Sequence, residues 1–266
     1  MRDFEKYRNR YKYVRMSRNE LGILEVTLHT DGGSLMWGVH QHRELTEAFR
    51  DIALDRANRV VLLTGAGEEF LGPRANLPHG NMTAQVAAAG VQQNAAMWER
   101  DAFSDAREMT NAILDIAVPV VCAINGPVRR HCETALMSDL IIASDTASFE
   151  DSAHFELQDL VPGDGIHVIA TMLLGINRAR AFMLTGEPIG AQEALRLGLV
   201  AEVLPKGDVL ERARAHARRI AQKSDSTLRF TRALLVHPIK KAMLELLGPG
   251  LAYEGLAALG RRDAAH

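Results

Sequence analysis

Three side chains that can accept or donate protons lie within a short stretch of the chain. They are His131 in the turn "NGPVRRHCE", His154 in "FEDSAHF" and Asp164 in "LVPGDG". A neutral imidazole is a suitable base near pH 7, and a carboxylate beside its other nitrogen fixes the tautomer and stabilises the imidazolium. Two histidines and a carboxyl group therefore indicate acid–base catalysis if the fold brings them together.

The turn before His131 carries unexpectedly large side chains. A chain that bends at Asn-Gly-Pro and then starts a helix normally has small residues at the bend, because a ligand must approach the backbone there. Arg129, Arg130 and His131 stand at this bend instead. The histidine therefore replaces bare backbone with a group that can transfer a proton.

Simpler interpretations exist for several of these residues. Asp164 could cap the helix that follows it, and Glu254 has the pattern of a solvated helical residue. Trp37 could belong to the core. A zinc site is not indicated, because no His-x-x-x-His or carboxylate spacing clusters the histidines on one element. No role is assigned to the histidines at 40, 79, 167 and 237.

Short apolar runs alternate with amphipathic helices over the first 150 residues. The pattern predicts helices over 42–55 and 103–116, and strands over 22–30, 59–65, 119–127, 139–144 and 147–149. Parallel crossovers would connect these strands, so the expected fold class is α/β. His42 shares a helical face with Leu45 and Phe49, and therefore should point inward.

The chain becomes mostly helical after residue 165. We expect a spiral core over 1–200 and a helical region over 201–266, which ends in two helices, 237–248 and 250–262. The breaker Gly248-Pro249-Gly250 would separate that last pair. The alanine-rich stretch 77–98 has the composition of an irregular, lid-like segment over a site.

Composition restricts the partners and the compartment. The 266 residues are 47% hydrophobic and carry a net charge of −2, so no basic footprint for nucleic acid or an anionic membrane is present. The first twenty residues lack the apolar run that is typical of a signal peptide, and no later segment has about twenty uninterrupted apolar residues, so we expect neither export nor a membrane span. The two cysteines, Cys122 and Cys132, lie in apolar segments without a metal or redox spacing. We therefore expect a cytoplasmic protein without a membrane span.

Two groups of motifs resemble the crotonase (enoyl-CoA hydratase/isomerase) superfamily over about residues 10–235. One is "INGPV" with "CETALMSDLIIAS", and the other is "RARAFMLTGEPIGAQEALRLGLVAEVLP". The resemblance implies a spiral core of repeated strand-strand-helix turns and a C-terminal helical trimerisation region, in a homotrimer or a dimer of trimers. It also implies an oxyanion hole made by two backbone N–H groups, but the usual glycines are replaced by "FLGPRANLP" and "RRH".

This departure resembles the 6-oxocamphor hydrolase type of β-diketone hydrolase, which cleaves a carbon–carbon bond without CoA. The type carries a tryptophan and a histidine at a strand exit, matched here in "MWGVHQH", and a Phe-x-Asp-x-x-His-Phe motif, matched in "FEDSAHF". Six positions match in order along the chain, namely Trp37, His42, His131, His154, Asp164 and Glu254.

The resemblance implies a retro-Claisen hydrolysis of a 1,3-diketone, which we expect to be cyclic, and this reaction needs neither metal nor organic cofactor. His154 with Glu254 would activate water, and His131 with Asp164 would bind the second carbonyl and protonate the enolate. Trp37 would hold a carbonyl oxygen through its indole N–H, and His42 would line the pocket.

Two other functions stay open from the sequence. An enoyl-CoA hydratase or isomerase would use Glu133 in "CETALMSD" and Glu156 as its acid–base pair. A catalytically silent binding subunit is the third possibility, but unpaired buried polar groups cost about 1 to 3 kcal/mol each, which argues against keeping so many without a reaction.

Overall fold

Six strands form the main sheet of the part of the chain that the computed structural model describes, residues 3–74 and 95–263. Their order in the sheet is β1 (Val14–Arg18), β2 (Ile23–Leu28), β4 (Val60–Gly65), β6 (Val120–Ile124), β7 (Leu140–Ser144) and β10 (Glu202–Leu204). β1 pairs with β2 in antiparallel orientation, and every other neighbouring pair in this sheet is parallel. The α/β class expected from the sequence is confirmed; β1 is an edge strand that the sequence analysis did not predict.

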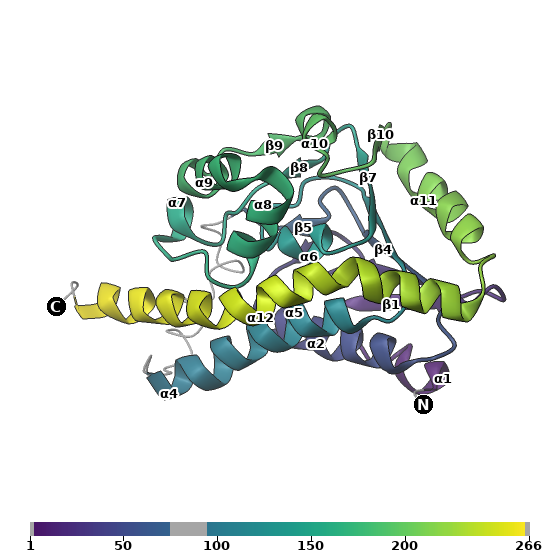
Figure 1. Ribbon diagram of the computed structural model, residues 1–266, viewed down its shortest axis with the longest axis horizontal. Coiled ribbons are helices and arrows are strands. Elements are labelled where there is room, and N and C mark those ends of the chain that lie inside the picture. Colours follow the sequence, from purple (N-terminus) through teal and green to yellow (C-terminus); the bar gives the residue numbers. More distant parts are fainter. Residues whose placement is uncertain (1–2, 75–94, 264–266) are drawn as a thin grey trace.

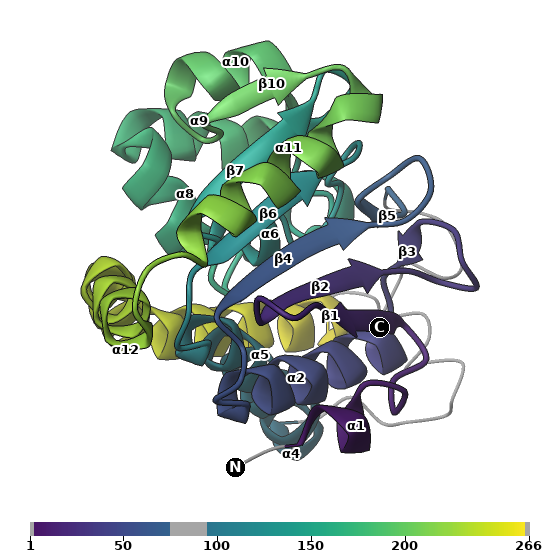
Figure 2. The same ribbon diagram turned by 90° about the vertical axis from the view of Figure 1, so that its right-hand side faces the viewer.

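Both faces of the central strands are buried. Along β4, Val61 and Leu63 point into the larger core, while Val60 and Leu62 point to the opposite face, as the two-residue period of a strand requires. The helix α11 (Lys206–Ile220) covers that opposite face and packs on β4, β6 and β7 (Figure 2). The larger core lies against α2 (Val39–Leu54) and α5 (Ser104–Asp115), which pack on each other.

Short strands form a second layer that carries most of the predicted site residues. β3 (Leu35–Met36) pairs with β5 (Leu71–Gly72), and β8 (Ser148–Phe149) pairs with β9 (Ile189–Gly190). Val128 connects these two pairs, because it forms bridges to both Leu71 and Phe149. The segment after β3 contains Trp37, the segment after Val128 contains His131, and the segment after β8 contains His154.

The other helices in the described part of the chain surround these two layers. They are α1 (Phe4–Tyr7), α4 (Ala95–Trp98), the π-helical turn η1 (Glu99–Phe103), α6 (Glu133–Leu136), α7 (Phe155–Gln158), α8 (Ile166–Leu174), α9 (Ile176–Thr185), α10 (Ala191–Leu197) and α12 (Asp225–Asp263). Most of the expected lid-like stretch, residues 77–94, lies outside the described residues. Within the described ranges, none of the helices combines the length and the apolar character needed to cross a membrane.

The expected break at Gly248-Pro249-Gly250 is wrong, because α12 continues through it as one helix of 39 residues. Figure 1 shows α12 along one side of the molecule, next to α5 and below α8. Pro249 cannot donate a backbone hydrogen bond inside the helix. His167 lies across this part of the helix, with its Nε2 3.3 Å from the carbonyl oxygen of Leu246.

The glycine after Pro249 has a packing role. A side chain at Gly250 would meet the carbonyl oxygen of Gly163 at 2.5 Å and the ring of His167, while one at Gly163 would meet the carbonyl of Gly250 at 2.2 Å. The two backbones therefore touch, which only glycine allows. This contact brings the next turn of α12, including Glu254, against the loop that carries Asp164. The segment Gly248-Pro249-Gly250 has the pattern of a helix breaker, but in the fold it forms a close contact between α12 and the loop before α8.

A buried arginine ties the other end of α12 to the sheet. Arg232 is fully buried, its Nε lies 2.6 Å from Asp139 Oδ2, and its guanidinium also donates to the carbonyl of Ile116. Cys122 and Cys132 are free and buried, as predicted. The proposed division into 1–200 and 201–266 stays a prediction, although β10 and α11 both pack on the main sheet.

Candidate active site

The structure brings the six residues selected from the sequence into one connected cluster. They come from different parts of the fold: Trp37 follows β3, His42 lies in the first turn of α2, His131 precedes α6, His154 precedes α7, Asp164 precedes α8, and Glu254 lies in α12. All six side chains are buried. Tertiary packing therefore joins positions that are far apart along the chain.

His131 contacts two carboxyl groups through the same ring nitrogen. Its Nδ1 lies 2.8 Å from Asp164 Oδ2 and 3.1 Å from Glu133 Oε1. Burial alone would lower the pKa of His131, but the adjacent charges of Asp164 and Glu133 raise it to about 9. His131 is therefore an imidazolium at neutral pH, and its proton on Nδ1 is shared between two acceptors.

His154 contacts carboxyl groups on both sides of its ring. Nδ1 lies 2.7 Å from Asp151 Oδ1, and Nε2 lies 3.3 Å from Asp164 Oδ2 and 4.0 Å from Glu254 Oε1. The nearest carboxylate is thus Asp151, which the sequence analysis did not select, although its position three residues before His154 in "FEDSAHF" was a usable signal. Glu254, the partner expected for His154, is nearby but at a longer distance.

Asp164 is the central group of the cluster. Burial would raise its pKa, but the two imidazoles hold the pKa of this carboxyl well below its usual range. Its Oδ2 contacts both rings, whose centroids are 5.9 Å apart. The cap of α8 is Gly165 and makes no side-chain capping hydrogen bond, so the structure gives Asp164 no capping role.

Two carboxyl groups at the edge of the cluster have raised pKa values. Burial raises the pKa of Glu254 to about 8. Burial and the charge of Asp164 raise the pKa of Glu133 to about 7. Both groups therefore gain or lose a proton near neutral pH, which is the range in which a general acid or base works best.

The aromatic wall of the cluster consists of Trp37 and His42. The Trp37 ring lies over His131 at 4.4 Å between centroids, and the His42 ring meets Trp37 edge-on at 5.6 Å. Burial lowers the pKa of His42 to about 3, so this ring is neutral. His42 is buried on the inner face of α2, as its spacing from Leu45 and Phe49 predicts.

The backbone at His131 takes a conformation that side chains rarely adopt. Its φ is 47°, in the left-handed region, where a residue other than glycine is strained by about 1 to 2 kcal/mol. The contacts with Asp164 and the Trp37 ring hold the imidazole in place. A strained backbone that is held in place by several side-chain contacts is typical of a functional site.

Several buried polar atoms of the cluster have no hydrogen-bond partner among the described residues. One is a donor, the indole Nε1 of Trp37, and four are carboxyl oxygens, Oε2 of Glu133, Oδ2 of Asp151, Oδ1 of Asp164 and Oε2 of Glu254. Leaving such an atom unpaired costs about 1 to 3 kcal/mol. One free donor beside several free acceptors is the pattern expected of a site that binds a carbonyl oxygen and a water molecule.

The second glutamate of the hydratase alternative lies outside this cluster. Glu133 is buried, but Glu156 is exposed in α7, where its side chain contacts Gly186. The acid–base pair that this alternative requires is therefore not assembled in the described structure.

Among the described residues, one group of side chains could coordinate a cation, and these side chains already share a proton. The candidate ligand atoms of His131, Glu133 and Asp164 lie within 4.8 Å of one another. The proton on His131 Nδ1 takes the position between the two carboxylates, so we assign no metal to this group. The grouping comes from three segments, which is why spacing along the sequence did not show it.

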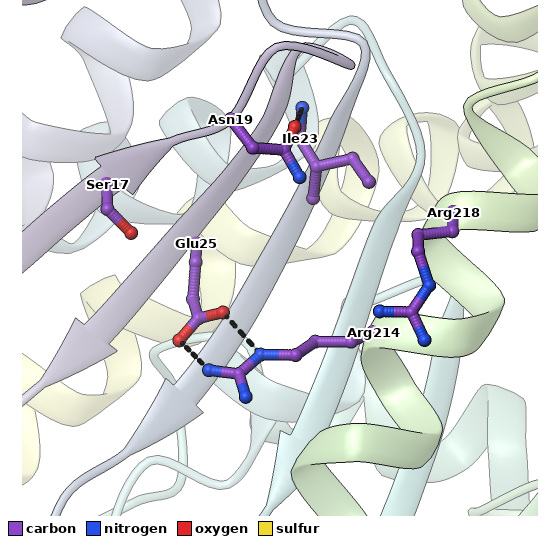
Figure 3. A pocket seen from close by; sticks show the side chains of 6 residues that line it. All are labelled: Ser17, Asn19, Ile23, Glu25, Arg214 and Arg218. Atoms are coloured by element: carbon purple, nitrogen blue, oxygen red, sulfur yellow. Dashed lines mark hydrogen bonds and ion pairs between the residues drawn. The ribbon is translucent and has the colours of Figure 1, made fainter.

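A pocket separate from this cluster lies beside β2, between the sheet and α11 (Figure 3). It measures about 100 Å³, and Glu25 and Arg214 face each other across it through two hydrogen bonds of 2.9 and 2.8 Å. Arg218 is paired with Glu211 at 2.7 Å. The charged groups here satisfy one another, so this pocket has a structural rather than a chemical character.

Comparison with known proteins gives a consistent family. The family model for enoyl-CoA hydratase/isomerase matches residues 20–247. A protein of Mycobacterium bovis named "probable enoyl-CoA hydratase" is 30% identical over 213 residues, which cover 79% of this chain and 75% of that protein. A crystal structure of an enoyl-CoA hydratase/isomerase from Mycobacterium paratuberculosis has a TM-score of 0.77 at 24% identity, over 92% of this chain and 93% of that one, which shows a shared fold.

One solved structure is similar in both sequence and fold. It is a β-diketone hydrolase from the cyanobacterium Anabaena sp. PCC 7120, bound to (S)-3-oxocyclohexyl acetic acid. The two chains are 38% identical with a TM-score of 0.87, and the match covers 97% of each. The relatives thus include two kinds of enzyme, and the described site must distinguish between them.

Proposed function

Because the chain belongs to the enoyl-CoA hydratase/isomerase (crotonase) family, whose fold alone does not determine the reaction, we propose that it hydrolyses a carbon–carbon bond of a 1,3-diketone. The reaction is a retro-Claisen cleavage of a cyclic diketone to a keto acid. The observation that carries the proposal is the buried cluster in which His131 and His154 share Asp164, with the indole N–H of Trp37 unpaired beside them. The 38% identity to a β-diketone hydrolase supports it.

The first step of the proposed reaction is attack of water. The pair His154–Glu254 removes one proton while the water oxygen bonds to one carbonyl carbon, which gives an anionic tetrahedral adduct. The positive charges of the imidazoles stabilise this adduct in a buried, weakly screened site. No cofactor is needed for this step, because the second carbonyl already activates the substrate.

Collapse of the adduct breaks the carbon–carbon bond. Its electron pair becomes that of an enolate, whose oxygen accepts a hydrogen bond from Trp37 Nε1, an atom without a partner among the described residues. The imidazolium of His131 then protonates the enolate carbon. The proton from water returns from Glu254 by way of Asp164, which contacts His131, so one water molecule is consumed and the site is restored.

The hydratase alternative keeps one supporting observation, the names of several relatives near 30% identity. Glu133 is buried and its pKa is raised, as an acid–base group requires, but Glu156 is exposed. With a single glutamate in place, hydration of a thioester lacks its second proton-transfer group. The diketone reaction uses the groups that are assembled.

A paired assay tests this proposal. The purified protein is incubated without added metal or cofactor with a cyclic 1,3-diketone and, separately, with crotonyl-CoA. We expect loss of the diketone enol absorbance, a keto acid product and no thioester turnover. Hydration of crotonyl-CoA without diketone cleavage would instead assign the chemistry to Glu133. Turnover by His154→Ala at the wild-type rate would contradict the assigned role of that histidine.

We also propose that the protein is cytoplasmic and assembles into a trimer or a dimer of trimers. Large apolar side chains are exposed on α8, α9 and α12, including Ile176, Leu184, Phe230, Leu234, Leu244 and Leu256. An apolar cavity of about 290 Å³ opens among Phe155, Leu184 and Tyr253. Such surfaces are typical of interfaces. Sedimentation equilibrium that finds a monomer at assay concentrations would contradict the assembly.

A further inference from the structure

Asp151 makes the shortest contact of His154, and the reaction proposed above gives it no role. Its Oδ1 lies 2.7 Å from His154 Nδ1, and both side chains are only 2% exposed. The two residues share the short segment between β8 and α7, three positions apart. A buried carboxylate at hydrogen-bond distance from an imidazole is a strong constraint on that ring, because neither group can turn to water instead.

The other nitrogen of His154 also faces carboxyl oxygens. Nε2 lies 3.3 Å from Asp164 Oδ2 and 4.0 Å from Glu254 Oε1. An ionised carboxylate only accepts hydrogen bonds, and a neutral imidazole has a donor on only one of its two nitrogens. A neutral His154 would therefore direct a lone pair at either Asp151 or Asp164. Both contacts are satisfied only when both nitrogens carry protons.

We propose that Asp151 is a positioning residue which, together with Asp164, holds His154 as a doubly protonated imidazolium, so that Glu254 is the group that accepts the proton from water. The role given to Glu254 rests on the proposed diketone hydrolysis. The protonation state of His154 does not, because it follows from contacts in the free protein.

The charged surroundings of His154 agree with this geometry. Burial would lower the pKa of His154, but Asp151 and Asp164 raise it well above its usual value. The opposing positive groups are His131, whose ring centroid is 5.9 Å away, and the buried Arg130, which interacts with both aspartates. The groups that face His154 are therefore Asp151, Asp164, Glu254, His131 and, through the aspartates, Arg130.

In this arrangement two residues divide the work that His154 would otherwise do alone. Glu254 accepts the proton from water, and His154 stabilises the adduct with its positive charge. An imidazolium clamped at both nitrogens cannot take a further proton, so it acts as a fixed positive charge beside the tetrahedral adduct. Glu254 has a raised pKa and an oxygen, Oε2, without a partner among the described residues, as a base requires. Proton transfer from water to Glu254 forms one O–H bond and breaks another, and the hydroxide adds to the carbonyl carbon.

Nitrogen NMR of the histidine rings tests the charge state directly. Protein labelled with ¹⁵N-histidine gives separate signals for protonated and unprotonated ring nitrogens, and the spectrum of His154→Gln identifies which pair belongs to His154. We expect both His154 nitrogens to be protonated from pH 6 to pH 8, with His42 neutral in the same spectra. A neutral His154 at pH 7 in the wild-type protein overturns the proposal without any variant.

The variant Asp151→Asn tests whether Asp151 is the reason that His154 stays doubly protonated. It keeps the size of the side chain and removes its charge, so the titration midpoint of His154 should fall by about 1 to 3 pH units. The matched control is Asp51→Asn, which alters another buried aspartate, one that accepts a hydrogen bond from Tyr11 at 2.7 Å. The control should leave the His154 signals unchanged. Unchanged signals in Asp151→Asn would overturn the proposal.

Activity then distinguishes this inference from the proposed function. In Asp151→Asn, the kcat for a diketone should decline with rising pH in the range where His154 loses its proton, and wild type should show no such decline there. A protein that cleaves no diketone but has a charged His154 contradicts the reaction only. A protein that cleaves the diketone with a neutral His154 contradicts the positioning role of Asp151 only.

Discussion

Two groups of opposite charges in this protein differ in burial and in how completely they are paired. In the candidate active site, His131, His154, Asp151 and Asp164 are buried and tightly paired, yet oxygens of Asp164 and Glu254 and the indole nitrogen of Trp37 have no partner in the described structure. Beside α11, Arg214 and Glu25 are partly exposed and hold each other through two hydrogen bonds (Figure 3).

The difference shows how charge is used for reaction and for structure. A paired charge near water has little left to offer a ligand, and contributes about 0 to 1 kcal/mol to stability. A buried cluster with unpaired atoms is costly unless something binds there. The active-site cluster is therefore expected to affect turnover strongly and the α11 pair hardly at all, and the following changes test that contrast in order of expected effect.

The largest effect is expected from Asp164→Asn. This carboxylate contacts both imidazoles, so its loss removes the charge that holds them protonated and breaks the return path for the proton. We expect kcat for a cyclic diketone to fall by about 10² to 10⁴ with binding largely kept. Because Asp164 does not cap α8, circular dichroism should show a folded protein; a variant that only unfolds would favour a structural role.

The pH dependence of turnover should be bell-shaped. Glu254 must lose its proton to act as a base, and burial raises its pKa to about 8, so activity falls below that pH. His131 must keep its proton to protonate the enolate, and its pKa is raised to about 9, so activity falls above that pH. The two limits belong to the coupled cluster. Activity that is highest at pH 5 would contradict these roles.

Trp37→Phe should have an intermediate effect. Phenylalanine keeps an aromatic ring over His131 and removes the N–H that would bind the enolate oxygen. Loss of one such hydrogen bond costs about 1 to 3 kcal/mol, so kcat/KM should fall by about 10- to 100-fold. If steady-state kinetics show an unchanged value, the indole serves packing only.

Glu133→Gln should cost less than about tenfold in diketone turnover. Asp164 still holds Nδ1 of His131 at 2.8 Å, so the variant weakens one of two contacts, worth about 1 kcal/mol. The same variant separates the two candidate enzymes, because an enoyl-CoA hydratase would lose its acid–base group. Parallel assays on both substrates make that distinction, and a severe loss of diketone cleavage would argue for a direct role of Glu133.

The smallest effect is expected from Arg214→Ala. Its pair with Glu25 lies beside α11, on the opposite face of the main sheet from the core that contains Trp37, so kcat should not change. The free energy of unfolding in urea should change by about 0 to 1 kcal/mol. A large loss of turnover here would show that the two charge groups are energetically connected.

The sequence by itself determined most strands and helices of the core, except the edge strands β1 and β10, and most residues of the candidate site. β4 and β6 are continuous apolar runs because both faces of these strands are buried, and this pattern is readable without a structure. The six residues from Trp37 to Glu254 were selectable because their motifs resemble those of a known enzyme type. Local patterns and matched motifs need no knowledge of distances.

Tertiary structure alone decided how those residues are connected. Gly248-Pro249-Gly250 has the local pattern of a break, but the contact between Gly250 and Gly163 makes it a continuous helix that delivers Glu254. The nearest partner of His154 is Asp151, and Glu254 lies further away. Packing between distant segments decides which carboxylate faces which ring nitrogen, and how deeply each group is buried. The pKa values follow from both, because charges interact through space and not along the chain.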